Sequence, residues 1–231
     1  MKVFDEDTIA EFENYTIIGF AGTKRCGKDT AGSVVENTYG FTQEKLTAPV
    51  KETVKTVFAF DDITGASKDE TDEFWGISPR QAMQLVATDF FQDQFDADIW
   101  VKSLARRMKS SSNHEFVVTD LRYPRQCFAL QQLGGKVFYI KRPEVEHELS
   151  SLKKLLSQVL PSKLKSWLPM TFEAHYHPSE IAMLDSSYAD NPDILNEGLT
   201  IDEYRSLVSD KIGEYLSRES HKSSFTRALS S

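Results

Sequence analysis

The stretch that most constrains the fold of this chain is residues 20–30, which read Phe-Ala-Gly-Thr-Lys-Arg-Cys-Gly-Lys-Asp-Thr. Gly22, Gly27 and Lys28 complete the pattern G-x-x-x-x-G-K, in which a tight glycine-rich turn points several backbone N–H groups at one anion. An apolar, β-branched segment precedes this stretch, and an apolar helical stripe follows it. A phosphate-binding loop requires this order of strand, loop and helix. Residues 20–30 are therefore predicted to bind phosphate.

The residues around the lysine suit a nucleoside triphosphate. Lys28 would reach the outer phosphates, and the first turn of the helix adds unpaired N–H groups and the positive end of its dipole. Asp29 stands where Ser or Thr is usual, and the hydroxyl comes one residue later, at Thr30. Asp29 can hold Mg²⁺ directly or through water, although its charge opposes an incoming phosphate. The residues predicted to bind ATP are Gly22, Lys24, Arg25, Cys26, Gly27, Lys28, Asp29 and Thr30.

The length and charge of the chain limit its ligands. Its 231 residues are enough for one domain with a full core, and its formal net charge is −8. Negative charge argues against binding a nucleic acid polymer, so a polyanionic ligand must meet a local basic pocket. No apolar run approaches the roughly 20 residues that span a bilayer, and the acidic first residues do not resemble a signal peptide. We therefore expect a cytoplasmic protein that acts on a small phosphorylated molecule away from membranes.

Strands and helices are expected to alternate along the chain. The segments with a strand-like apolar pattern are residues 15–20, 41–46, 116–119, 136–141 and 194–196. This alternation predicts an α/β sandwich of three layers, with a mostly parallel sheet and helices on both faces. Residues 1–216 would form a single domain with a helical insertion or lid at about 144–180, and residues 217–231 a disordered tail. Residues 1–14 are expected to be loosely held, and the acidic stretch 61–73 to be a solvated loop.

A helix predicted to start after Ser78 carries polar side chains on one face. Arg80, Gln84 and Thr88 are spaced by four residues, which places them side by side on that helix. Arg80 suits an anion, and Gln84 and Thr88 can hydrogen-bond a base or a sugar. Trp100 can stack on a base, although its apolar neighbours at helical spacing favour ordinary core packing.

Charged residues follow the ends of several predicted strands. Ligands of parallel α/β sheets bind beyond the carboxyl ends of the strands, where the phosphate loop, Asp120 and Arg142 would meet. Asp120 ends an apolar strand, as in a Walker B segment that orients Mg²⁺, and capping of the next turn is the alternative. Arg122 can grip a phosphate bidentately, and Arg142 can close over the γ-phosphate as a lid. Asp29 and Asp120 are the predicted metal ligands.

These cations are suited to phosphoryl transfer, in which catalysis is mostly positioning and neutralisation of the transferred group. The nucleophile of a nucleotide kinase is an acceptor phosphate oxygen, which is already ionised near neutral pH. No strong general base is then needed. The predicted catalytic residues are Lys28, Asp120, Arg122 and Arg142.

A series of short stretches also matches a known family in order and spacing. They are Gly22–Thr30, Pro79–Asp89, Trp100–Lys102, Asp120–Arg122, Val137–Pro143, His177–Glu180 and Asn196–Gly198. In this series the chain resembles the deoxynucleoside monophosphate kinases of tailed bacteriophages. The resemblance implies a P-loop NTPase fold, transfer of the γ-phosphate of ATP to a deoxynucleoside monophosphate (dNMP), Mg²⁺ as cofactor, and suggests a homodimer. The residues that it places around the acceptor are Arg80, Gln84, Thr88, Trp100, Asp120, Arg122 and Gln126, the last in place of the family's usual glutamate.

Two other functions stay open beside a dNMP kinase that serves DNA precursor synthesis. A P-loop kinase can act on another small acceptor, such as phosphomevalonate or dephospho-coenzyme A, although Gln84, Thr88 and Trp100 suit a nucleobase better. A degenerate P-loop protein can bind nucleotide without catalysis and act through a partner. That third function rests on Asp29, which stands where a phosphate loop usually has Ser or Thr, and on Gln126, which stands where the family usually has glutamate.

Overall fold

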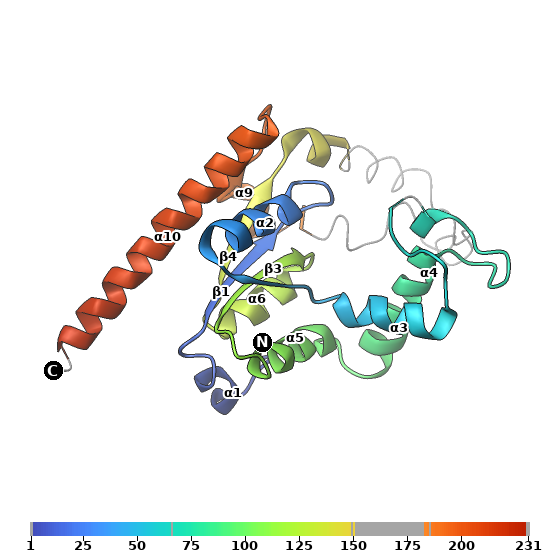
Figure 1. Cartoon of the computed structure of the whole chain (residues 1–231), viewed down its shortest axis with the longest axis horizontal. Coiled ribbons are helices and arrows are strands. Elements are labelled where there is room, and N and C mark those ends of the chain that lie inside the picture. Colours follow the sequence, from blue (N-terminus) through green and yellow to red (C-terminus); the bar gives the residue numbers. More distant parts are fainter. Residues whose placement is uncertain (1, 66, 149, 151–182, 185, 230–231) are drawn as a thin grey trace.

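The computed structural model describes residues 2–65, 67–148, 150, 183–184 and 186–229 (Figure 1). One sheet contains the strands β1 (Thr16–Ala21), β2 (Thr42–Glu44), β3 (Glu115–Leu121), β4 (Lys136–Lys141) and β5 (Ile194–Leu195). Their order across the sheet is β2-β3-β1-β4-β5, and each neighbouring pair is parallel. The predicted strands and the parallel sheet are confirmed.

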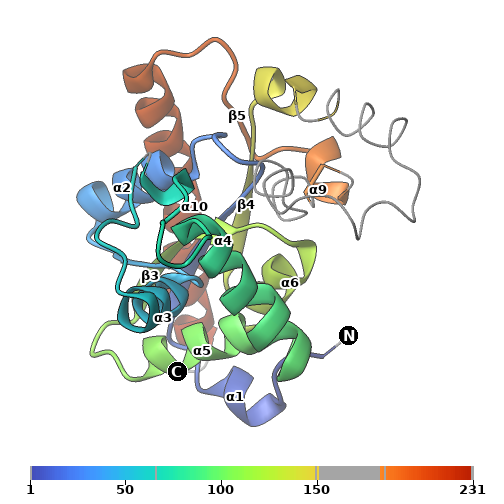
Figure 2. The same cartoon turned by 90° about the vertical axis from the view of Figure 1, so that its right-hand side faces the viewer.

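Helices connect the strands and lie on both sides of them. The helices are α1 (Glu6–Ala10), α2 (Lys28–Tyr39), α3 (Ala48–Phe58), the 3-10 helix η1 (Ser67–Asp69), α4 (Pro79–Gln84), the π-helix η2 (Leu85–Gln92), α5 (Ile99–Lys109), α6 (Pro124–Gln132), α9 (Ser187–Asp190) and α10 (Ile201–Leu229). Figure 1 shows α10 on one flank of the sheet and α3, α4 and α5 grouped on the other. Figure 2 looks from that second side and shows these three helices in front of the strands.

Alternate residues of the central strands supply two apolar cores, one on each face of the sheet. Ile18 and Val117 pack in one core with residues of α2 and α10. Ile17 and Val118 belong to the other core, with residues of α3, α5 and α6. Successive side chains of a strand point to opposite faces, and strands buried on both faces read as continuous apolar runs. The predicted α/β sandwich of three layers is therefore confirmed.

Sequence signals for the helix ends hold at α2 and at the start of α10. Gly40 adopts φ +78° just after α2, as a glycine stop does. Thr200 and Glu203 form a capping box, since the Thr200 N–H donates to the Glu203 carboxylate at 2.8 Å and the Glu203 N–H donates to the Thr200 hydroxyl at 3.3 Å.

The disordered tail expected from residue 217 stays a prediction, and the described residues of that stretch belong to α10. The helix α10 continues to Leu229, and in Figure 1 its far end projects away from the sheet. No glycine or proline occurs after Gly213 to end the helix.

The remaining domain boundaries stay a prediction. The insertion at about 144–180 begins with a helical segment at 143–148, and its part from 151 lies outside the described residues.

The beginning of the chain is better anchored than its acidic composition suggests. Val3, Phe4 and Phe12 are buried against the core that contains α5 and α6. The Val3 N–H also donates to the side chain of Gln132 at 2.9 Å. The expectation that residues 1–14 are loosely held is therefore wrong. Burial of three apolar side chains stabilises this segment, although the residues between them are charged.

None of the helices in the described ranges has the length and apolar character that a membrane span needs.

Candidate active site

The loop between β1 and α2 has a backbone that only glycine can supply at two positions. Gly22 has φ +145° and Gly27 has φ +115°. A Cβ atom at Gly22 would lie 2.5 Å from the carbonyl oxygen of Ile140, and one at Gly27 would lie 2.8 Å from the hydroxyl of Tyr204. Positive φ and close packing together explain both glycines of the G-x-x-x-x-G-K pattern.

Gly27→Ala is expected to destabilise the protein by about 2–4 kcal/mol, because the positive φ costs about 1–3 kcal/mol and the new methyl group meets Tyr204. It should also weaken ATP binding about tenfold, since the loop must shift. Urea unfolding and calorimetric titration with ATP measure both effects. Gly40→Ala is the matched control, because Gly40 has φ +78° with nothing within 4 Å of a Cβ atom. Equal losses in the two variants would contradict the role of the Tyr204 contact.

Lys28 lies over the loop and binds its carbonyl groups. Its Nζ donates to the carbonyl oxygens of Gly22 at 2.8 Å and Thr23 at 2.6 Å. Two residues behind the loop hold its shape: Asn196 donates to the carbonyl of Cys26 at 2.9 Å, and Tyr204 to that of Gly27 at 3.1 Å. The hydrogen bond of Tyr204 to the loop is a tertiary contact that no local pattern reveals.

Cys26 is a buried part of the loop rather than an activated thiol. Its side chain has no exposed surface and lies 3.6 Å from the Nζ of Lys28. Burial raises the pKa of the Cys26 thiol above its usual value, against the opposing charge of Lys28. The thiol therefore stays neutral.

Asp29 lies exposed in the first turn of α2, and its carboxylate contacts Lys45 and Thr119. Its Oδ1 accepts from the Nζ of Lys45 at 2.7 Å and from the hydroxyl of Thr119 at 3.3 Å. Burial raises the pKa of this carboxyl, but the hydrogen bond and charge of Lys45 outweigh burial, so the net pKa is lowered. An ionised carboxylate next to the Thr30 hydroxyl fits Mg²⁺, which prefers oxygen ligands and usually keeps several waters.

Asp120 is buried at the end of β3, and its carboxylate holds the start of α3. Oδ1 accepts from the N–H of Leu46 at 2.8 Å, while Oδ2 accepts from the N–H and the hydroxyl of Thr47 at 3.0 and 2.8 Å. These three bonds fill most of the acceptor positions of a carboxylate. Asp120 therefore holds the start of α3, more than 70 residues earlier, rather than capping the next turn, and it fits a metal ion less well than Asp29. Among the described residues, no three His, Cys, Asp or Glu side chains gather at one point.

A cavity of about 350 Å³ lies beyond the end of β3, between α3, α4, η2 and α5. We call it the Arg80 cavity. All the residues predicted to surround the acceptor line it: Arg80, Gln84, Thr88, Trp100, Asp120, Arg122 and Gln126. They come from two stretches of the chain, residues 80–100 and 120–126, which the fold brings together.

One wall of the Arg80 cavity is the helix predicted from Ser78. The side chain of Ser78 and that of Gln81 form a capping box at its start. After Gln84 the chain winds as a π-helix, which changes the spacing expected for Thr88. Arg80, Gln84 and Thr88 still line the same cavity. Arg80 is paired with Asp69 through two hydrogen bonds, and this pair was not predicted.

Trp100 is held by core packing and also borders the Arg80 cavity. Its side chain is 7% exposed, and its ring packs against Phe91 at 5.3 Å between centroids. Its Nε1 donates to the carbonyl of Ala87 at 3.0 Å. Core packing therefore fixes the ring, and its remaining surface lines the Arg80 cavity. A fixed ring is a rigid surface for a flat ligand.

Two arginines follow strand ends directly: Arg122 comes after β3 and Arg142 after β4. Gln126 lies in α6, just beyond Arg122. The side-chain oxygen of Gln126 accepts the N–H groups of Arg122 at 2.8 Å and Tyr123 at 3.1 Å, so Gln126 holds the turn that carries Arg122. Arg142 donates to the carbonyl of Arg25 at 3.4 Å. Arg142 therefore lies against the phosphate loop, and Arg122 lies in the Arg80 cavity.

The phosphate loop and the Arg80 cavity are joined by three consecutive residues, 45–47. Lys45 pairs with Asp29 of α2, whereas Leu46 and Thr47 bind Asp120 in the cavity. The charge of Lys24 also contributes to lowering the pKa of Asp69, after the hydrogen bond from Arg80. The two sites are thus neighbours at the carboxyl ends of the strands, where ligands of parallel sheets bind.

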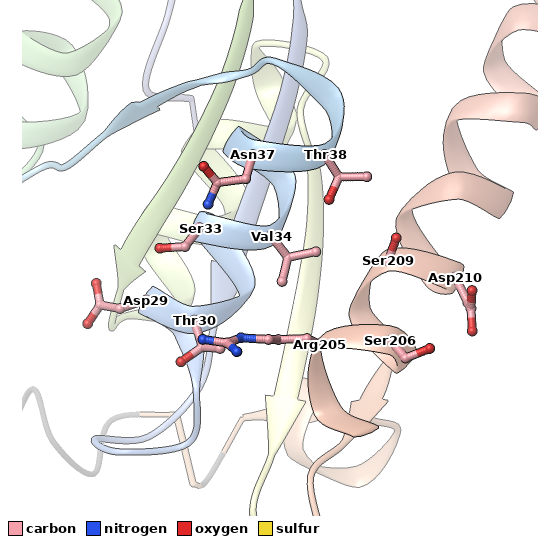
Figure 3. Close-up of a pocket in the computed structure, with 10 residues that line it drawn as sticks. All are labelled: Asp29, Thr30, Ser33, Val34, Asn37, Thr38, Arg205, Ser206, Ser209 and Asp210. Carbon is pink, nitrogen blue, oxygen red and sulfur yellow. The ribbon is translucent and has the colours of Figure 1, made fainter. Parts of the chain in front are cut away.

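A second cavity, of about 650 Å³, lies in a groove between α2 and α10 (Figure 3). Asp29 and Thr30 line the end of the groove next to the phosphate loop, and Figure 3 shows Arg205 reaching from α10 toward Thr30. Hydroxyl and amide side chains line most of the rest. The predicted ATP residues Asp29 and Thr30 therefore border open space on the side away from the Arg80 cavity.

Comparison with known proteins, like the residues of the site, indicates a kinase of nucleotides. Residues 56–151 match the family model described as deoxynucleotide monophosphate kinase. This range contains the predicted residues of the Arg80 cavity and also Arg142, while the phosphate loop precedes it. A protein of Acanthamoeba polyphaga mimivirus named "Putative deoxynucleotide monophosphate kinase" is 28% identical over 164 residues, which cover 59% of this chain and 83% of that protein. The resemblance to nucleotide kinases therefore has support, and a bacteriophage source has none.

Solved structures resemble the chain only distantly. TT1252 from Thermus thermophilus has a TM-score of 0.45 and 14% identity, and covers 87% of this chain and 98% of its own. Dephospho-CoA kinase from Campylobacter jejuni has a TM-score of 0.41 and 15% identity, with 86% and 96% covered. These scores are too low to support an argument about function.

Proposed function

We propose that this protein is a deoxynucleoside monophosphate kinase that transfers the γ-phosphate of ATP to a dNMP, giving dNDP and ADP for DNA precursor synthesis. The observation that carries the proposal is that Arg80, Gln84, Thr88, Trp100, Asp120, Arg122 and Gln126 all line one cavity beside the phosphate loop. The matched family model and the mimivirus relative support a kinase of nucleotides.

The donor side of the proposed reaction is the phosphate loop. Its backbone N–H groups and the Lys28 ammonium would hold the outer phosphates of ATP, in place of the two carbonyls that Lys28 binds now. Arg142 lies against the loop at Arg25 and would neutralise the transferred phosphoryl group. When bound, Mg²⁺ would be held by Asp29 and the hydroxyl of Thr30, and would offset the charge of the phosphates.

The acceptor side of the proposed reaction is the Arg80 cavity. Arg80 and Arg122 would bind the monophosphate, whose oxygen is the nucleophile and is already ionised near neutral pH. Gln84 and Thr88 would hydrogen-bond the base or the sugar, and Trp100 would supply a flat surface to the ring. Asp120 would act by fixing the start of α3, which closes one side of the cavity.

The proposal extends to the organisation of the protein. Residues 1–216 would form one kinase domain, with the insertion at about 144–180 as its lid. We propose that the protein works as a homodimer in the cytoplasm, the host cytoplasm if the source is a virus. Neither a nucleic acid polymer nor a membrane is required by this chemistry.

An ADP-release assay with dAMP, dCMP, dGMP, dTMP and non-nucleotide acceptors tests the proposal. We expect turnover with at least one dNMP and none with dephospho-coenzyme A or phosphomevalonate. Turnover with only a non-nucleotide acceptor would assign the cavity to another small phosphorylated substrate. Retained ATP binding without turnover on any acceptor would indicate a non-catalytic nucleotide-binding protein.

A further inference from the structure

The unpredicted pair between Arg80 and Asp69 connects the Arg80 cavity to the acidic stretch 61–73. The Nε and Nη2 atoms of Arg80 donate to the two carboxylate oxygens of Asp69, the second at 3.3 Å. The Arg80 side chain is 17% exposed, whereas that of Asp69 is 49% exposed. The carboxylate thus holds the guanidinium from the outer side of the cavity wall.

This pairing uses only one edge of the guanidinium group. Arginine has five N–H donors in a planar fork, and the edge formed by Nη1 and Nη2 can bind a second anion bidentately. Among the described residues, no hydrogen bond joins Nη1 of Arg80 to the protein. Arg80 therefore lines the cavity with donors that a phosphate can use while Asp69 stays in place.

Local hydrogen bonds join described residues of the segment that carries Asp69. Asp62 accepts the N–H of Thr64 at 2.8 Å, and the N–H of Lys68 donates to the carbonyl of Thr64 at 3.3 Å. Asp69 ends the 3-10 helix η1, and Thr64 and Lys68 also line the Arg80 cavity. Thr64 and Lys68 thus belong to the wall of the cavity, while the acidic residues Asp61, Asp62, Asp69 and Glu70 are exposed, as predicted for a solvated loop.

We propose that Asp69 is a positioning residue for the acceptor: it fixes one edge of Arg80 so that the other edge meets the phosphate of the monophosphate substrate. This inference rests on the proposed function. A free arginine side chain loses much rotamer entropy when it is immobilised on a ligand, and Asp69 removes part of that cost before binding. The positive charges of Lys68 and Lys24 act on Asp69 and offset its repulsion of an anion.

Asp69 stays ionised at the pH of a kinase assay. The hydrogen bond from Arg80 comes first among the causes that lower the pKa of its carboxyl, with burial opposing it. Asp69→Asn therefore removes a charge that is present in the working protein, and it keeps the size of the side chain.

The test compares Asp69→Asn with Glu70→Gln in steady-state kinetics and in calorimetric titration with the dNMP that the wild type uses best. Glu70 is the next residue and is exposed, so Glu70→Gln removes the same charge from the same segment. We expect Asp69→Asn to raise KM for the dNMP about fivefold to tenfold with kcat within about twofold. We expect Glu70→Gln to change neither. In an Arg80→Ala background, Asp69→Asn should have no further effect.

Each outcome decides the inference. An unchanged KM in Asp69→Asn, with the thermal midpoint of the wild type retained, would overturn it. A lower KM would also overturn it, because Asp69 would then compete with the acceptor phosphate. A wild-type protein that phosphorylates no dNMP would refute the proposed function itself, which is a different result from turnover with an unaltered KM.

Discussion

Lys28→Met is expected to lower kcat/KM by about 10²–10³-fold, the usual effect of removing one charged donor from a site of charge stabilisation. The Nζ of Lys28 lies within the phosphate loop, bound to the carbonyls of Gly22 and Thr23. A bound triphosphate offers stronger, charged acceptors at the same place. Methionine has nearly the same length and can fill the space, but it cannot neutralise the transferred phosphate. Steady-state ADP release at varied ATP measures the loss.

The same variant should remain folded. It loses hydrogen bonds to two carbonyls at a partly buried position, which is expected to cost about 1–2 kcal/mol in urea unfolding. Lys211→Met is the matched control, because Lys211 is exposed on α10 and loses the same charge. Its activity should equal that of the wild type. Full activity in Lys28→Met would show that the Lys28 ammonium group is not needed for catalysis, and would contradict the proposed role of the phosphate loop.

Arg80→Ala is expected to raise KM for the dNMP about 10–100-fold and to leave KM for ATP unchanged. A bidentate bond between arginine and phosphate is charge-assisted and is worth about 1.5–3 kcal/mol. Because Arg80 would grip the acceptor equally in the ground state and the transition state, the loss should appear in KM rather than in kcat. The measurement is initial velocity with each substrate varied separately.

Arg80→Lys serves as the control for charge. Lysine keeps the positive charge but loses the planar fork, so its KM should fall between those of the wild type and Arg80→Ala. A KM equal to that of the wild type would mean that charge alone matters at this position. An effect confined to ATP would place Arg80 on the donor side of the reaction.

The sheet and the phosphate loop could be predicted because their signals are local. The run at 136–141 is apolar and β-branched over the length of one buried strand, and β4 has these bounds. Gly22, Gly27 and Lys28 carry a pattern whose backbone requirements are local as well. The residues predicted to surround an acceptor line one cavity, and their role there stays a prediction.

The contacts that tune the site could not be predicted, since they join residues distant in sequence. Asp120 is bound to Leu46 and Thr47, which lie more than 70 residues earlier. The hydroxyl of Tyr204 reaches Gly27 across 177 positions. Composition correctly indicated that most acidic residues of 61–73 are exposed, but it carried no sign that Asp69 pairs with Arg80. Local periodicity carries no information on such tertiary pairs.

The most direct test of the account is a crystal structure with the dNMP that the assay selects. The account predicts that the nucleotide lies in the Arg80 cavity, with its phosphate bound by Arg80 and Arg122 and directed toward Lys28. A nucleotide bound elsewhere, with the cavity closed or filled by water alone, would contradict it.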